Sequence, residues 1–208
     1  MQRGKFITFE GCDGCGKSTQ LKKLSDYLAA NNVAHIFTRE PGGGKISEEI
    51  RGILLNGKNA EMTDECEALL YAAARAQHLS DRVEPALKEG KLVVCDRYVD
   101  SSFAYQAFAR GLGFEFIEKI NAFALEKYLP DVTVFIDLSA EDAFKRKHGA
   151  DENDRLEQAG MAFHKRVYEG YKAVEKAYPN RVVAVDGKQT PQQIFAQVLQ
   201  ILKERDCL

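Results

Sequence analysis

An eight-residue motif near the start of the chain restricts the fold more than any other feature of this sequence. Residues Gly11–Ser18 read Gly-Cys-Asp-Gly-Cys-Gly-Lys-Ser and fit the pattern G-x-x-x-x-G-K-[ST] in full. A strand-like segment, Phe6–Phe9, precedes the motif, and a stretch with leucines at helical spacing, Ser18–Ala30, follows it. This context indicates a phosphate-binding P-loop and disfavours the alternative, a glycine-rich turn with a chance lysine.

Each part of this loop has a physical role. Its glycines allow backbone N–H groups to converge on an anion, and the helix that begins near Lys17 adds the positive end of its dipole. Lys17 can reach the β- and γ-phosphates of ATP, and the Ser18 hydroxyl can bind Mg²⁺. The expected ATP-binding residues are Gly11, Cys12, Asp13, Gly14, Cys15, Gly16, Lys17, Ser18 and Thr19.

The rest of the chain alternates short apolar strands with longer helical stretches, a pattern typical of a parallel sheet covered by helices on both faces. The expected strands are Phe6–Phe9, Val33–Thr38, Leu92–Cys95, Val132–Ile136 and Val182–Val185. The expected helices are 18–30, 46–55, 65–88, 114–127, 140–147, 155–178 and 191–204. Because the sequence has no repeat, linker or low-complexity tract, we expect a single α/β domain of the P-loop NTPase type over residues 1–208, with a five-stranded parallel sheet.

The composition argues against several classes of partner. The formal net charge is -2 over 208 residues, so no global basic field points to nucleic acid. No apolar run approaches the roughly 20 residues of a membrane span, and no apolar leader with a cleavage site follows Met1, so we expect a cytoplasmic protein without a membrane partner. The odd number of cysteines, five, argues against a disulfide framework. Cys12 and Cys15 have a Cys-x-x-Cys spacing, which leaves a redox role open, but a zinc site would need two further ligands.

Charged residues at three further strand ends favour a kinase among the P-loop proteins. They are Thr38-Arg39-Glu40, Asp96-Arg97-Tyr98, and Asp137 followed by Lys145-Arg146-Lys147. Ligands of open parallel sheets bind beyond the carboxyl ends of the strands, so we expect these side chains to meet at one site. Two anionic substrates that face each other need several cationic groups of this kind. The Asn-Lys-x-Asp signature of GTPases is absent from the sequence.

The order and spacing of these motifs resemble the thymidylate kinase family, of the bacterial kind, over almost the whole chain. The resemblance rests on Phe9-Glu10-Gly11, Thr38-Arg39-Glu40-Pro41-Gly42-Gly43, Glu48-x-x-Arg51, Tyr71-Ala72-Ala73-Ala74-Arg75-Ala76-Gln77-His78, Asp96-Arg97-Tyr98-x-x-Ser101-x-x-Ala104-Tyr105-Gln106, Pro130-Asp131 and Asp154-Arg155-x-Glu157. It implies a nucleoside monophosphate kinase-like fold, transfer of the γ-phosphate of ATP to dTMP in dTTP synthesis, and Mg²⁺ as cofactor. It also implies a homodimer formed through helices that include 65–79 and 114–127. The alternatives are a kinase for another nucleoside monophosphate or a deoxynucleoside, and a nucleotide-binding switch without transferase activity.

The resemblance also implies an acceptor site. Asp13 would bind the 3′-hydroxyl of the sugar, although it could instead stabilise the turn, and Arg97, helped by Arg51, would bind the acceptor phosphate. Tyr71 would stack on thymine, unless it is a core aromatic, and Arg75 would donate to O4 of the base. The remaining implied contacts are Gln106 at the polar edge of the base and Tyr105 against the 2′ position of the sugar. Ser102 is a further implied contact, at a position that varies within the family.

The source of the catalytic positive charge is the least determined part of the resemblance. Some family members carry an arginine directly after the acidic residue of the P-loop, but Gly14 occupies that position here, which implies a mobile lid at about residues 146–155 as the source. The candidate catalytic residues are Lys17, Arg97, Arg146, Lys147 and Arg155, with His148 as a further lid cation. Asp96 would position Mg²⁺ together with Ser18, or would only orient Arg97.

Three further positions have open roles. Arg146 and the turn 186–189 would lie near the adenine of ATP. Arg39 either helps to shape the acceptor pocket or pairs with a nearby carboxylate. Gly44 replaces a threonine that is usual in the family, with an open effect on acceptor binding.

Overall fold

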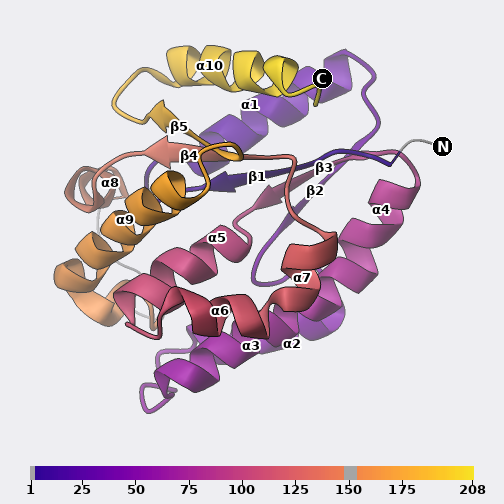
Figure 1. Cartoon of the computed structure of the whole chain (residues 1–208). Helices are drawn as coiled ribbons and strands as arrows, with labels where there is room; N and C mark the ends of the chain where they lie inside the picture. The colour runs from indigo at the N-terminus through magenta and orange to yellow at the C-terminus, as the bar shows by residue number, and fades with distance from the viewer. Residues whose placement is uncertain (1–2, 148–153) are drawn as a thin grey trace.

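The computed structural model describes residues 3–147 and 154–208 of the chain. Within these residues one sheet is formed by β1 (Phe6–Glu10), β2 (His35–Arg39), β3 (Leu92–Asp96), β4 (Val132–Asp137) and β5 (Val182–Asp186). The strands lie in the order β2-β3-β1-β4-β5, and every neighbouring pair is parallel. The predicted five-stranded parallel sheet is therefore confirmed (Figure 1).

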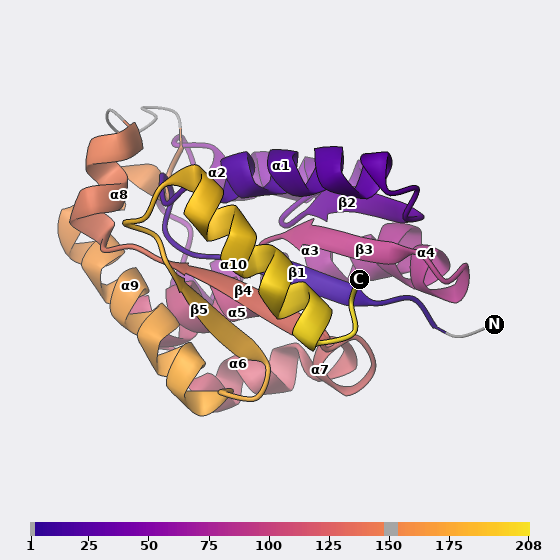
Figure 2. The same cartoon turned by 90° about the horizontal axis from the view of Figure 1, so that it is seen from above.

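Helices cover both faces of the sheet, as predicted. In chain order they are α1 (Lys17–Ala30), α2 (Lys45–Leu55), α3 (Asp64–His78), α4 (Glu84–Lys88), α5 (Val99–Ser102), α6 (Phe114–Ile120), α7 (Ala122–Lys127), α8 (Ala140–Lys147), α9 (Gly160–Ala177) and α10 (Pro191–Glu204). α1 and α10 lie on one face, and α5 and α9 lie on the other (Figures 1 and 2). Alternate strand residues point to opposite faces, so Ile7 packs in the core beneath α1 and α10, whereas Phe6 belongs to the core on the opposite face.

Three predicted helices had wrong bounds. The stretch 65–88 is divided by a π-helical turn, Leu79–Val83, just before Pro85, whose nitrogen cannot donate a helical hydrogen bond. The stretch 114–127 is interrupted at Asn121, and α9 starts at Gly160, after a 3₁₀ turn, instead of at Arg155. The sequence reasoning also missed α5 and the π-helical segment that continues it, Phe103–Ala109.

The sheet brings its polar strand ends to one edge. Phe9 pairs with Asp96, Arg39 also pairs with Asp96, and Asp137 pairs with Asp186, so the carboxyl ends of the strands are level with one another. The P-loop leaves β1 at this edge and leads into α1. No described helix combines the length and the apolar character that a membrane span requires.

Candidate active site

The P-loop lies between β1 and α1, as its sequence context predicts. Lys17 is 7% exposed, and its Nζ donates to the carbonyl oxygens of Gly11 at 2.9 Å and Cys12 at 3.2 Å. Ser18 and Thr19 are exposed at the start of α1. The loop opens on a cavity, the phosphate cavity, which is lined by Asp13, Gly14, Gly16, Lys17, Ser18, Thr19, Arg39, Glu40, Arg51, Asp96, Arg97 and Lys147.

The structure leaves no room for a side chain at Gly14 of the P-loop. Its φ of +88° is in the left-handed region, and a Cβ at this position would lie 2.2 Å from the carbonyl oxygen of Ala143 and 3.1 Å from Cβ of Lys147. α8 therefore packs directly on the loop at this point. Any side chain at position 14 would require α8 to move away.

The two loop cysteines are buried and unreactive in character. Burial raises the pKa of Cys12 to about 12 and also raises that of Cys15. Reactive cysteines are thiolates in electropositive, partly exposed surroundings, and these two side chains are only 4% and 0% exposed. The structure thus gives no support to a redox role for the Cys-x-x-Cys spacing.

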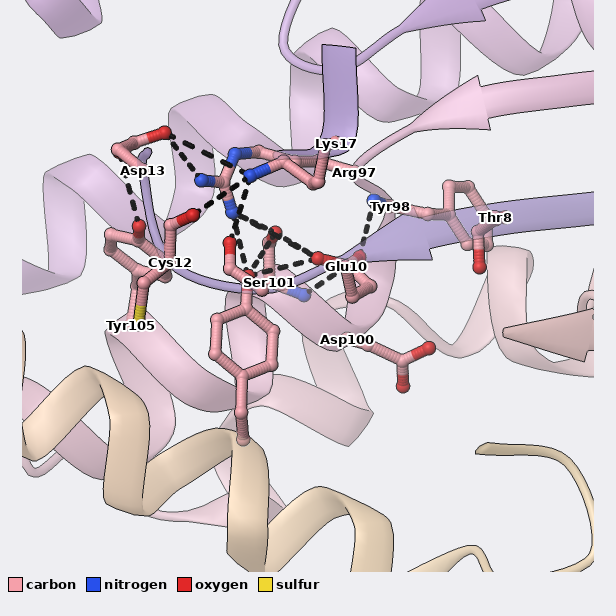
Figure 3. A network of polar contacts seen from close by, with 12 residues as sticks. Thr8, Glu10, Cys12, Asp13, Lys17, Arg97, Tyr98, Asp100, Ser101 and Tyr105 are labelled. Atoms are coloured by element: carbon pink, nitrogen blue, oxygen red, sulfur yellow. Dashed lines mark hydrogen bonds and ion pairs between the residues drawn. The ribbon is translucent and has the colours of Figure 1, made fainter. Parts of the chain in front are cut away.

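Arg97 joins the P-loop to the rest of the site. Its guanidinium donates to Asp13 Oδ1 at 2.6 Å, to the hydroxyl of Tyr171 at 2.7 Å and to Ser101 Oγ at 3.2 Å (Figure 3). It also lies over the ring of Tyr105, 5.4 Å from the centroid. Desolvation favours neutral Asp13, but the charges of Arg97 and Lys17 outweigh it and hold the pKa of Asp13 well below its usual range.

Glu10 lies behind Arg97 and is almost completely buried. It accepts hydrogen bonds from Ser101 Oγ at 2.6 Å, from the Tyr171 hydroxyl at 2.9 Å and from the backbone N–H of Tyr98 at 2.7 Å. Burial, and next the nearby carboxylate of Asp100, raise the pKa of Glu10 to about 7, against the opposing charge of Arg97. The same two hydroxyl groups therefore bind both Glu10 and Arg97, and they fix the position of the guanidinium.

A second cavity, the aromatic cavity, lies beside the first. It encloses about 630 Å³ of space, part of which is open to solvent. Its lining residues are Asp13, Glu40, Pro41, Arg51, Leu55, Tyr71, Arg75, Arg97, Tyr98, Ser101, Tyr105, Gln106, Asp154, Leu156 and Glu157. Four of them, Asp13, Glu40, Arg51 and Arg97, also line the phosphate cavity, so the two cavities meet at a pair of arginines.

Arg75 is held rigidly at the wall of the aromatic cavity. It is 1% exposed, and its guanidinium donates to Glu40 Oε2 at 2.8 Å, to Asn121 Oδ1 at 2.6 Å and to Ser102 Oγ at 3.1 Å. Glu40 also binds His78 at 2.9 Å. Three of the five guanidinium N–H groups are thus engaged within the described part of the chain, which leaves one on each terminal nitrogen for a ligand.

Comparison with known proteins assigns this arrangement to a family. The sequence model described as thymidylate kinase matches residues 9–198. The chain belongs to the thymidylate kinase family. The thymidylate kinase of Clostridium novyi (strain NT) is 47% identical over 205 residues, which cover 98% of this chain and 100% of that protein. The thymidylate kinase of Finegoldia magna is 47% identical over 203 residues, with 98% and 100% covered, and that of Lactobacillus helveticus is 47% identical over 206 residues, with 98% and 97% covered.

Most residues that the sequence singled out for a thymidylate kinase site lie around the two cavities. The acceptor candidates Asp13, Arg51, Tyr71, Arg75, Arg97, Tyr105 and Gln106 all line the aromatic cavity. Ser102 does not line it; this buried serine lies behind Arg75 and accepts a hydrogen bond from it. Arg39 forms the alternative that its spacing left open, a pair with Glu48 at 2.9 Å.

The cations predicted for a lid lie in different places. Lys147 lines the phosphate cavity and pairs with Glu157. Arg146 donates to the carbonyl oxygen of Gly187 at 2.8 Å, beside the turn predicted near adenine. Arg155 is bound to Glu67 and to the carbonyl oxygen of Leu54. Residues 148–153 of the predicted lid, His148 among them, lie outside the described residues.

The predicted magnesium ligands fit a cation site. Ser18 and Asp96 both line the phosphate cavity. Oδ1 of Asp96 is buried and has no hydrogen-bond partner among the described residues, which is a costly state for a carboxylate oxygen unless a cation or its water approaches. Hydroxyl and carboxylate oxygens are also the ligands that Mg²⁺ prefers.

Sequence reasoning missed the buried carboxylates that hold the arginines in place. Glu10, Glu40 and Glu67 each bind one or more site residues from behind. Glu10 and Glu40 were inside the quoted motifs but had no assigned role. Glu67 had one usable signal, because it precedes Tyr71 by four residues and Arg75 by eight and so shares their helix face.

Proposed function

We propose that this chain is an ATP-dependent dTMP kinase, in which the phosphate cavity binds ATP and the aromatic cavity binds dTMP. The observation that carries the proposal is the junction of the two cavities at Asp13, Arg51 and Arg97. A nucleotide in each cavity would have its phosphate groups at this junction, facing each other. The reaction is then ATP + dTMP → ADP + dTDP.

Catalysis at this junction would rest on position and charge. The acceptor is a phosphate oxygen that already carries negative charge near neutral pH, so no general base is needed. Arg97 would hold the acceptor phosphate, since its planar fork suits phosphate oxygens and Tyr171 and Asp13 fix its direction. Lys17 would turn from the loop carbonyls to the transferring phosphate. Mg²⁺, held by Ser18 and Asp96, would neutralise charge on the phosphate oxygens.

Lys147 is our candidate for the additional positive charge. Its Cβ lies beside Gly14, where other family members begin an arginine side chain, and it lines the phosphate cavity. Its partner Glu157 also borders the aromatic cavity, so Lys147 is near both substrates. Arg155 is the weaker candidate, because it does not line the phosphate cavity and its guanidinium is bound to the fully buried Glu67.

A homodimer is part of the proposal. Three large apolar side chains on α2 and α3, Ile46, Ile53 and Leu69, are 49%, 47% and 51% exposed. Leu69 lies on α3, one of the helices that the family resemblance assigns to the subunit interface, and Ile46 and Ile53 lie on α2, which packs against α3. Burial of such side chains against a second copy would remove apolar surface from water.

A panel of acceptors tests the proposed reaction. ADP release should be measured with ATP and, in turn, dTMP, dUMP, UMP, CMP and AMP. We expect the highest kcat/KM with dTMP, and measurable activity with dUMP, because the missing methyl group is worth only about 1–3 kcal/mol. A higher kcat/KM for any other acceptor would contradict the proposal, and ATP binding without transfer to any acceptor would favour a nucleotide-binding switch.

A further inference from the structure

A buried carboxylate on α3 contacts three side chains near the aromatic cavity. Glu67 is 0% exposed. Its Oε1 accepts from the Gln106 side-chain nitrogen at 2.7 Å and from Arg110 Nε at 3.3 Å. Its Oε2 accepts from Arg110 at 3.0 Å and from Arg155. Glu67 does not itself line the cavity, but Gln106 does, so the carboxylate lies one layer behind the cavity wall.

This contact determines which end of the Gln106 amide faces the cavity. A carboxylate between two guanidinium groups offers only acceptors. The Gln106 group that meets Glu67 must therefore be its NH₂, whichever way the amide is first assigned. The carbonyl oxygen of Gln106 is then directed away from Glu67, and as a cavity-lining residue Gln106 presents this oxygen to a ligand.

Arg75 supplies the complementary group to the same cavity. Arg75 has only donors, and its position is fixed by Glu40, Asn121 and Ser102. A base in the cavity thus meets a donor from Arg75 and an acceptor from Gln106. Thymine offers O4 as an acceptor and N3–H as a donor, which matches both groups. Cytosine offers the reverse at both positions, so its amino group would face Arg75 and its unprotonated N3 would face the Gln106 oxygen.

We propose that Glu67 is a positioning residue that sets the acceptor preference, by holding Gln106 with its carbonyl oxygen toward the base. The proposal rests on the proposed dTMP kinase activity and adds to it the device that excludes cytosine nucleotides. Glu67, Tyr71 and Arg75 occupy positions i, i+4 and i+8 of α3. One face of a single helix therefore carries the stacking ring, the donor and the group that orients the acceptor.

The test compares kcat/KM for dTMP and dCMP in matched variants. Glu67→Gln gives residue 67 an amide that can donate as well as accept, so Gln106 is free to turn. We expect the dTMP:dCMP ratio to fall at least tenfold, with an ATP KM within twofold of the original. In a Gln106→Ala background the same Glu67→Gln change should not lower the ratio further, because Glu67 acts through Gln106. Asp64→Asn is the matched control, since Asp64 contacts Arg110 at 3.2 Å without contacting Gln106, and its ratio should stay unchanged.

A swapped pair tests the proposal even if Glu67→Gln alone fails to fold. In Glu67→Gln combined with Gln106→Glu, the new amide donates to the new carboxylate, which still presents an acceptor oxygen to the cavity. We expect this variant to prefer dTMP over dCMP. Three results would each overturn the role of Glu67. The first is loss of the preference for dTMP in the swapped pair, and the second is an unchanged dTMP:dCMP ratio in a folded Glu67→Gln variant. The third is a further fall of this ratio when Glu67→Gln is added to Gln106→Ala. A starting enzyme with no dTMP kinase activity would instead refute the proposed function.

Discussion

Lys147 is the candidate cation that lines the phosphate cavity, and its Cβ lies beside Gly14. We predict that Lys147→Met lowers kcat about 100-fold or more, with less than a fivefold change in ATP KM, because the charge acts on the transferring phosphate. Lys145→Met is the matched control on the same helix, since Lys145 is 78% exposed and pairs only with Asp142 among the described residues. Steady-state kinetics would decide between the candidates, and a normal kcat for Lys147→Met beside a large loss for Arg155→Met would reverse our assignment.

Glu10 makes the unfolding free energy of the protein depend on pH. Its pKa in the folded protein is about 7 against an ordinary value of 4.5, so between these values the unfolded chain releases the proton while the folded chain keeps it. The folded state therefore binds more protons in this window, and its stability falls as the pH rises from about 4.5 to about 7. The effect is on the order of 1–3 kcal/mol.

The matched variant for this effect is Glu10→Gln, which keeps the shape of the side chain and cannot titrate. We predict that the unfolding free energy of the original protein decreases more between pH 5 and pH 7.5 than that of Glu10→Gln, as measured by urea denaturation. The low pKa of Asp13 does not affect this comparison between pH 5 and pH 7.5. A depressed pKa changes the unfolding free energy only at pH values below the ordinary range of an aspartate. Parallel stability curves for the two proteins would show that Glu10 does not titrate in this window.

At the scale of elements, the contact between α8 and the P-loop depends on the missing side chain of Gly14. We predict that Gly14→Ala destabilises the protein by about 1–3 kcal/mol more than Gly113→Ala does. Gly113 is the matched control because its φ of +83° is nearly that of Gly14 at +88°, yet its added Cβ would meet no described atom within 4 Å. Both variants place an alanine at a φ of +83° or +88°, and the comparison of their unfolding free energies by chemical denaturation tests the overlap with Ala143.

The elements themselves were predictable where a periodic pattern or a motif marks them. The buried strands and the P-loop were placed almost to the residue, because apolar runs and glycines report local physics directly. The segment after Arg97 was missed, because α5 and its π-helical continuation bury nearly every side chain and so lack an amphipathic period. The break at Asn121 was missed for a different reason: its amide is bound to Arg75, 46 residues away in the sequence.

The prediction of the site from the sequence was limited in the same way as the prediction of the helices. Cations that follow strands could be named from the sequence, since the carboxyl ends of a parallel sheet meet at one edge. Their buried partners could not, because Glu10 contacts Tyr171 across 161 residues and Glu67 contacts Arg155 across 88. A spacing in the sequence carries no information about which carboxylate comes to lie behind which arginine. Only the packed fold determines those pairs, and they fix the direction in which each functional group points.

At the scale of the whole molecule, α3 links the acceptor site to the proposed subunit interface. One face of this helix carries Tyr71 and Arg75 at the aromatic cavity, and the other exposes Leu69. A partner that packs against Leu69 would hold the helix in place and so reduce the entropy lost when the base binds. The position of the base-binding side chains would therefore depend on the oligomeric state.

This coupling leads to a prediction for Leu69→Asp. We expect this variant to sediment as a monomer where the original protein sediments as a dimer, because a charge would have to be buried without a partner in the interface. Its dTMP KM should rise severalfold while its ATP KM changes less, since α3 lines the aromatic cavity and contributes nothing to the phosphate cavity. Leu208→Asp is the matched control, an apolar residue that is 37% exposed beyond α10 on the opposite side of the sheet, and it should remain dimeric. If Leu69→Asp is monomeric but its dTMP KM is unchanged, the assignment of the subunit interface to α3 would be supported, and the influence of that interface on the acceptor site would be refuted.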